Sequence, residues 1–301
     1  MRKNIPYPTF AYCITTALSA IYINQLATKI NPVASLLICV ITSTFFFHLI
    51  NYNNIKVIYI KFIETYKTSI AMNVSAGIVW VSTFIGLSII DPYIYIVIYF
   101  IIPSAISFIS TYRKNKSILD LISGLSLFII LGLSVYLYVH EINHIHNIFY
   151  GISLALLGGI FSYIYRVQAK SYSLTTKCTA SMVLCVRSYG IILFSATLLV
   201  FYPKIHSNAI PFNLHIVTLL LVVTILSFII PLYFNQKGIE IAGAKLHSII
   251  CASIPLITLI LSEFGHNQYV REETIGNYIL AILISAFLIL PGLIKKKRGQ
   301  E

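Results

Sequence analysis

The sequence predicts an all-α integral membrane protein with ten transmembrane helices. Of its 301 residues, 58% are hydrophobic and only 10% are charged, whereas soluble domains carry about 25% charged residues. The apolar residues fall into runs of about 20, the length of a helix that crosses a bilayer. Basic residues collect in alternate connections between these runs, as the positive-inside rule requires. A soluble domain of this size could not bury so much apolar surface.

The first five apolar runs are 10–28, 31–50, 68–89, 93–112 and 118–139. The first run follows Arg2 and Lys3 and continues past the length of a signal peptide, so we expect an uncleaved span. The polar and basic connection 51–67 predicts a short helix at the membrane interface, with lysines reaching the headgroups.

The second five runs are 147–168, 175–201, 214–235, 243–264 and 273–294. The eighth ends in FIIPLYFNQKG, where Pro231, Tyr233, Asn235 and Gln236 could form an inner gate, although a span that simply ends in polar interfacial residues is the favoured interpretation. The HEINHIH loop before the sixth run has a histidine spacing that could bind a metal ion, but a solvated external loop is the favoured interpretation, and no metal ion is expected.

The distribution of positive charge supports ten spans with both termini in the cytoplasm. In this topology 17 of the 21 Lys and Arg residues fall on the inner side, among them Arg166 near the end of the sixth run. The outer connections hold three, which are Lys29, Lys204 and Arg271, and the last is Arg187. The net charge of +12 lies in short clusters between apolar runs, which argues against a nucleic-acid partner.

An offset of 152 residues places the third to fifth spans over the eighth to tenth. Scarce residue types then coincide, as Gly86 with Gly238 and Pro103 with Pro255. Because five is odd, the second copy enters the membrane from the opposite side, which predicts two inverted five-helix repeats, 1–140 and 141–301. The two prolines lie near the middle of their spans, where each would bend its helix, so we interpret them as paired hinges.

The fourth and ninth spans carry a pattern of small residue, apolar run, Pro and apolar run. The ninth, GAKLHSIICASIPLITLILSEFG, ends this pattern with Pro255 and Glu263, whereas the fourth has Pro103 but Thr111 in place of the acid. With ten spans in two inverted halves, the chain resembles the drug/metabolite transporter superfamily, EamA-type. The resemblance implies a carrier of small organic solutes, often an exporter of amino acids or amphipathic metabolites. Arg187 looks like the arginine that the seventh span of this family often carries.

Arg187 is the strongest single candidate for a functional residue. A charge at the centre of a membrane helix costs about 2.5–3.5 kcal/mol, so this side chain should face the interior of the bundle. It could bind an anionic group of a substrate, such as a carboxylate, through two hydrogen bonds. Alternatively, it could bond helix carbonyls or pair with Glu263 and serve only the structure.

Other candidates fall into two groups. Possible ion-coupling residues are Glu263, His48 and His247, each of which could instead be an interfacial or capping residue. Asn73, Gly77 and Trp80 share one face of the third span, through spacings of four and three, and could line a cavity or pack against a helix. Further candidates for cavity lining are Tyr99, Tyr163 and Ser253.

These observations predict a secondary active transporter that alternates access around a midplane cavity, with amino-acid-like solutes exported. Uptake of a metabolite such as S-adenosylmethionine is an alternative, since the Asn-, Ile-, Lys- and Tyr-rich usage is compatible with a host-dependent bacterium. A channel and a membrane enzyme acting on lipid are further alternatives; the enzyme would use the histidines at 140–146.

The sequence has no GxxxxGK[ST] motif, so an ATP-driven pump is not expected. The expected partners are a small-molecule substrate and membrane lipids, with no cofactor. We expect a monomer or homodimer in a bacterial inner membrane.

The topology is testable with reporter tags at the two ends of the chain. We expect both tags to report the cytoplasmic side, because ten spans return the chain to the side where it started. A periplasmic signal from either end would contradict this topology.

Overall fold

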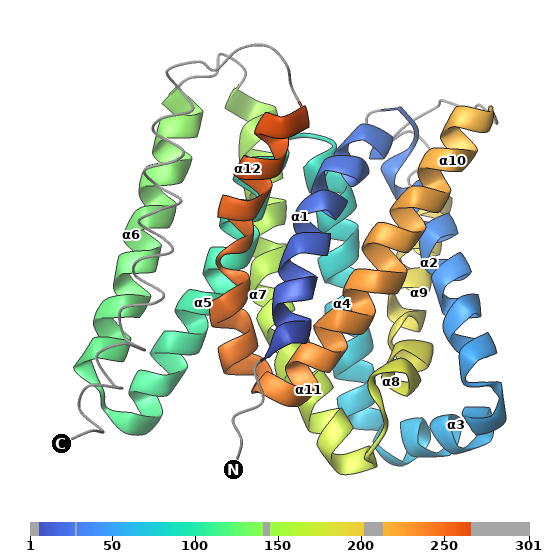
Figure 1. Cartoon of the computed structure of the whole chain (residues 1–301). Helices are drawn as coiled ribbons and strands as arrows, with labels where there is room; N and C mark the ends of the chain where they lie inside the picture. The colour runs from blue at the N-terminus through green and yellow to red at the C-terminus, as the bar shows by residue number, and fades with distance from the viewer. Residues whose placement is uncertain (1–5, 28, 141–144, 202–212, 266–301) are drawn as a thin grey trace.

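The computed structural model describes residues 6–27, 29–140, 145–201 and 213–265, and their side chains apart from those at 137–140, 145–147 and 262–265. Over these ranges the chain is helical and contains no strand (Figure 1). The helices stand side by side in one bundle, and α3 lies across its lower end (Figure 1).

Eight segments of the described chain are helical, long and apolar enough to cross a membrane. The protein is therefore a multi-pass membrane protein, as the sequence predicts. Five of the segments belong to the first half of the chain: α1 (Tyr7–Ala27), α2 (Pro32–Ile50), α4 (Tyr66–Leu87), α5 (Pro92–Asn115) and α6 (Ile118–His140). Three belong to the second: α7 (Ile145–Thr176), α8 (Ala180–Arg187) continued by α9 (Tyr189–Phe201), and α10 (Leu214–Val223) continued through η3 (Thr224–Ile229) by α11 (Ile230–Cys251).

The seven predicted spans up to residue 201 coincide with these helices. The predicted interfacial helix is present as η1 (Tyr52–Asn54) and α3 (Ile55–Glu64). The predicted ninth span, 243–264, is divided between the end of α11 and α12 (Ile254–Gly265). The predicted tenth span, 273–294, lies outside the described residues.

Helix starts follow from local sequence signals. Asn31 precedes Pro32, and its side-chain oxygen accepts hydrogen bonds from the backbone N–H groups of Val33 and Ala34 at 2.9 and 3.1 Å. Asp91 precedes Pro92 in the same way and accepts from the N–H of Tyr93 at 2.8 Å. A proline in the first helical turn has no N–H that would need a partner, so this pair starts a helix after a short turn.

Three irregular segments interrupt the second half of the chain. The helix of the seventh span is broken at Ser188, between α8 and α9. The segment η3 is a π-helix, a wide turn that is frequent at functional sites. At Gly243 the backbone turns sharply within α11 with φ of 76°, a conformation that favours glycine.

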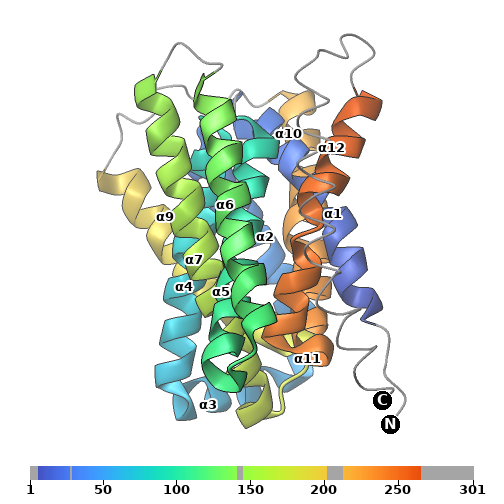
Figure 2. The ribbon, with the colours of Figure 1, turned by 90° about the vertical axis from the view of Figure 1, so that its left-hand side faces the viewer.

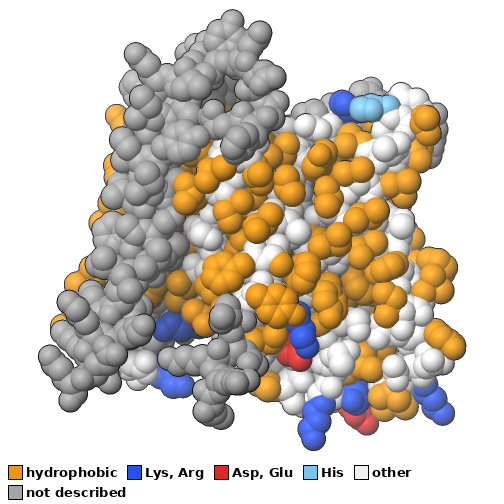
Figure 3. Space-filling model, viewed as in Figure 1, with side chains coloured by type: hydrophobic (Ala, Val, Ile, Leu, Met, Phe, Trp, Pro, Cys, Tyr) orange, Lys and Arg blue, Asp and Glu red, His pale blue; other side chains and the backbone are white. Residues whose placement is uncertain are grey.

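Helices from the two predicted halves are packed together in one bundle. The helix α1 contacts α11 and α12, and α4 contacts α7 and α9. Viewed from the side of α6, that helix stands in front of the bundle, and its main neighbour among the described helices is α5 (Figure 2). Basic side chains on the face shown in Figure 3 lie mostly at the end that carries α3.

The contact between α4 and α9 depends on Gly190. A Cβ atom on Gly190 would lie 2.0 Å from the backbone oxygen of Asn73, and one on Gly77 would lie 2.6 Å from the ring of Phe194. The amide nitrogen of Gly190 donates to the side-chain oxygen of Asn73 at 2.9 Å. Asn73 thus supplies a hydrogen-bond partner two residues after the break at Ser188.

Substitution of Gly190 should test this contact. We expect Gly190→Ala to lower the melting temperature of the purified protein, because the new methyl group overlaps a backbone oxygen of α4. Gly132→Ala in α6 is the matched control, since a Cβ there would meet nothing within 4 Å. Equal melting temperatures of Gly190→Ala and the wild type would show that the two helices can move apart at little cost.

Candidate functional site

A cavity lies inside the bundle between α1, α4, α5, α7, α8 and α11. The cavity and the solvent-open space at its mouth together hold about 690 Å³ that is not filled by atoms. Its lining includes Ile23 and Leu87, near the ends of α1 and α4, and reaches down to Arg187 at the end of α8. The cavity therefore extends from the interior of the bundle toward the end opposite α3.

Arg187 lines this cavity and is almost completely buried, with an exposed fraction of 1%. One terminal nitrogen, Nη1, donates a hydrogen bond to the hydroxyl of Tyr165 at 2.8 Å, and the guanidinium lies 5.0 Å from the centre of that ring. The other two nitrogens, Nε and Nη2, are buried without a hydrogen-bond partner. Tyr165 therefore holds one side of the guanidinium, and the edge formed by Nε and Nη2 has no partner among the described residues.

Tyr165 begins a chain of hydrogen bonds that leads from the cavity toward α3. Its hydroxyl donates to Oε1 of Gln236 at 3.0 Å, and Nε2 of Gln236 donates to the hydroxyl of Ser173 at 3.2 Å. Gln236 is fully buried. We call Arg187, Tyr165, Gln236 and Ser173 the polar chain; it joins α8, α7 and α11 below the cavity.

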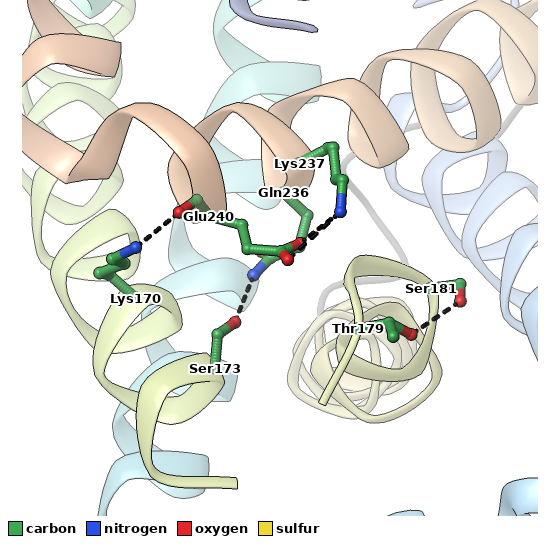
Figure 4. Close-up of polar contacts among 7 residues, drawn as sticks. All are labelled: Lys170, Ser173, Thr179, Ser181, Gln236, Lys237 and Glu240. Atoms are coloured by element: carbon green, nitrogen blue, oxygen red, sulfur yellow. Dashed lines mark hydrogen bonds and ion pairs between the residues drawn. The ribbon is translucent and has the colours of Figure 1, made fainter. Parts of the chain in front are cut away.

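More polar contacts close the same end of the bundle (Figure 4). The ammonium group of Lys170 on α7 donates to the backbone oxygen of Glu240 on α11 at 2.6 Å, and within α11 Lys237 forms an ion pair with the carboxylate of Glu240 at 3.1 Å. Lys61 of α3 donates to the backbone oxygen of Thr176 at 2.5 Å. The contacts at this end include hydrogen bonds, which can break and form again, in addition to apolar packing.

Arg166 is a second arginine in the lining, and its position corrects the sequence analysis. The helix α7 continues to Thr176, so Arg166 lies about 15 Å along the helix axis before its end and not in an inner loop. Its exposed fraction is 1%. Its Nη1 donates to the hydroxyl of Ser248 at 2.8 Å, and the guanidinium lies 5.8 Å from the centre of the Phe100 ring.

Aromatic rings form much of the remaining wall. Trp80 lies against Phe228, with ring centres 4.2 Å apart, and Tyr99 stacks on Tyr95 at 5.9 Å. Ser19 and Ser227 also line the cavity, and their hydroxyl groups are hydrogen-bonded at 2.6 Å. The wall can therefore contact an apolar or planar body, while the two arginines offer charge at one end.

The structure brings five of the predicted site residues into the lining, which are Arg187, Trp80, Tyr99, Pro231 and Asn235. Asn73 and Gly77 instead serve the packing of α4 on α9, as the contacts of Gly190 show. Tyr163 and Ser253 do not line the cavity. The hydroxyl of Ser253 donates to the backbone oxygen of Ile250 at 2.8 Å, in the turn between α11 and α12.

The two prolines predicted as paired hinges occupy different environments. Pro103 lies inside α5 and leaves the backbone oxygen of Tyr99 without its usual helical partner. A Cβ on Gly159 of α7 would lie 3.1 Å from this oxygen, so α7 covers it closely. Pro255 is the second residue of α12, where a missing N–H costs nothing. Pro231 occupies the same position in α11, directly after the π-helix.

The predicted coupling histidines both lie outside the cavity lining. Nδ1 of His48 donates to the backbone oxygen of Thr44 at 2.8 Å, and its Nε2 is 3.1 and 3.0 Å from the hydroxyls of Tyr59 and Tyr189. His247 is fully buried, with Nε2 2.7 Å from Oδ1 of Asn235 and Nδ1 3.1 Å from the hydroxyl of Thr9. Through Asn235 it is one contact away from the cavity.

Two sets of predicted residues cannot be placed. The side chain of Glu263 and those of the histidines at 140–146 lie outside the described residues. Among the residues that are described, no group of three or more His, Cys, Asp or Glu could hold a metal ion.

The sequence analysis did not single out Arg166 or Tyr165 as site residues, and it named Gln236 only as part of a possible inner gate. Arg166 carried a usable signal, because it lies within the predicted span 147–168. Tyr165 and Gln236 carried little sequence signal for their role in the polar chain, since that role comes from partners on other helices. A comparison of the sequence with family models and with curated proteins finds no match to either.

Removal of the Tyr165 hydroxyl should weaken the closed end of the bundle. Tyr165→Phe leaves Nη1 of Arg187 and Oε1 of Gln236 without their partner, and an unsatisfied buried group costs about 1–3 kcal/mol. We expect a lower melting temperature than that of the wild type. Tyr163→Phe is the matched control on the same helix, because this half-buried tyrosine makes no hydrogen bond to the described residues. A Tyr165→Phe protein as stable as this control would contradict the role of the polar chain.

Proposed function

We propose that this protein is a secondary active transporter of small organic solutes that carry a carboxylate group. The observation that carries the proposal is the buried edge of Arg187, which has no hydrogen-bond partner and belongs to a residue that lines the cavity. A guanidinium can bind the two oxygens of a carboxylate with two parallel hydrogen bonds. Amino-acid-like metabolites are the first class to test, and export is the proposed direction.

Alternating access is supported by the arrangement of the cavity. The cavity extends toward one end of the bundle, and the polar chain and the contacts of Lys61 and Lys170 lie at the other. Hydrogen bonds of this kind can break and form again at a modest net cost of about 0.5–1.5 kcal/mol each. A carrier needs such a reversible closure, whereas a channel needs a continuous path.

Both predicted halves of the chain contribute to the cavity. Its lining comes from α1, α4 and α5 in residues 1–140 and from α7, α8 and α11 in residues 141–301. A site between two inverted repeats can open to either side when one repeat rocks against the other. The resemblance to EamA-type transporters supports the same proposal.

The proposal predicts saturable counterflow in proteoliposomes preloaded with amino-acid-like carboxylates. Arg187→Gln should reduce the exchange about 10- to 100-fold, because hydrogen bonds to a charged group contribute about 1.5–3 kcal/mol. Arg113→Gln is the matched control, since Arg113 is exposed at the end of α5.

Three results would contradict the proposal. Flux that does not saturate would indicate a channel, and no exchange of any carboxylate would exclude this substrate class. Full exchange by the Arg187→Gln protein would remove Arg187 from the binding site. Counterflow does not depend on the direction of transport, so the export proposal needs a separate measurement in oriented vesicles.

A further inference from the structure

The cavity contains two positive charges and, among the described residues, no acidic side chain in its lining. Arg166 and Arg187 both line it, and each has an exposed fraction of 1%. Neither forms an ion pair within the part of the chain that the structure describes. The hydroxyl of Tyr99 lies within electrostatic range of both guanidinium groups, so the two charges act on the same region of the cavity.

The two nitrogens of Arg187 that have no hydrogen-bond partner are arranged as in a site for an anion. Nε and Nη2 form one edge of the guanidinium plane, and their N–H bonds point in parallel. This edge is the one left without a partner, because Tyr165 takes Nη1. Two oxygens of one carboxylate or phosphate group match the edge directly.

We propose that the transported solute is an organic anion with a charge of −2. This inference rests on the proposed transport function and specifies the charge of the solute, which replaces the zwitterionic amino-acid class by dianions and admits a phosphate group in place of the carboxylate. One acidic group satisfies the open edge of Arg187, and the second negative charge neutralises Arg166. A zwitterionic amino acid would bring an ammonium group next to two cations, with no carboxylate among the described lining residues to receive it.

The aromatic wall indicates what the rest of the solute is like. Trp80, Tyr95 and Tyr99 line the part of the cavity formed by α4 and α5. Such rings contact an apolar or planar body and favour it over a fully polar one. The chemistry of both arginines suits either a dicarboxylate or a phosphate monoester.

The test measures binding to purified protein by thermal shift and by competition in counterflow. The probes are glutarate, phenyl phosphate, benzenesulfonate, valerate and the zwitterion norvaline. We expect the two dianions, glutarate and phenyl phosphate, to bind at least 10-fold more tightly than the monoanions or the zwitterion. The better of the two dianions distinguishes a dicarboxylate substrate from a phosphate monoester.

The pH dependence of binding affinity tests the inference on the wild-type protein. A phosphate monoester loses its second charge below about pH 6, whereas benzenesulfonate stays a monoanion. Affinity for phenyl phosphate should therefore fall at least fivefold between pH 7.5 and pH 5, and affinity for benzenesulfonate should stay constant. An unchanged affinity for phenyl phosphate over this range would overturn the inference.

Variants of Arg166 test the second charge. Arg166→Gln should weaken dianion binding at least 10-fold and monoanion binding less than threefold, and Arg166→Lys should retain most of the dianion affinity. Equal losses for both classes would overturn the inference. If norvaline is exchanged and no dianion is, the proposed transport stands and the charge assignment is wrong; if no probe is exchanged, both are wrong.

Discussion

Two arginine side chains lie inside a bundle of apolar helices, and no acidic side chain of the described residues neutralises either of them. A buried charge must be compensated by hydrogen bonds, by water or by a ligand. Arg166 donates to a serine hydroxyl and lies near an aromatic ring, whereas Arg187 donates to one tyrosine and has one edge without a hydrogen-bond partner. Arg187 lies directly before the break between α8 and α9, and Arg166 lies within the long helix α7. Both line the same cavity.

The position of Arg187 depends on residues that touch no ligand. The helix of the seventh span stops at Ser188, and the next turn is held by the bond from Gly190 to Asn73 of α4. Only a residue without a Cβ lets α9 approach α4 this closely. Asn73 and Gly77 therefore support the site from behind, as packing residues.

The sequence was enough to predict the spans up to residue 201 and the buried arginine of α8, because long apolar runs and an isolated charge are local signals. It did not identify Arg166 as a residue of the bundle interior, since hydropathy alone does not show that α7 continues to Thr176. The spacing of Asn73, Gly77 and Trp80 correctly placed them on related faces of α4, but spacing does not reveal the opposing element. Gly190 and Phe194 of α9 face the first two, and the cavity faces Trp80. Tyr165, and the link from Arg187 to Gln236 that it forms, became visible only through contacts between helices.

The polar chain joins Arg187 to the end of the bundle near α3. Tyr165 accepts from Arg187 and donates to Gln236, so on the proposed function an anion that turned the guanidinium would also act on the bond between α7 and α11. A solute with two negative charges would make the loaded site neutral, whereas the empty site carries two positive charges. The membrane potential acts on charge, at about 2.3 kcal/mol per elementary charge and 100 mV. On the charge assignment proposed above, the return of the empty carrier is therefore the step that depends on voltage, to the extent that the two guanidinium groups move through the field.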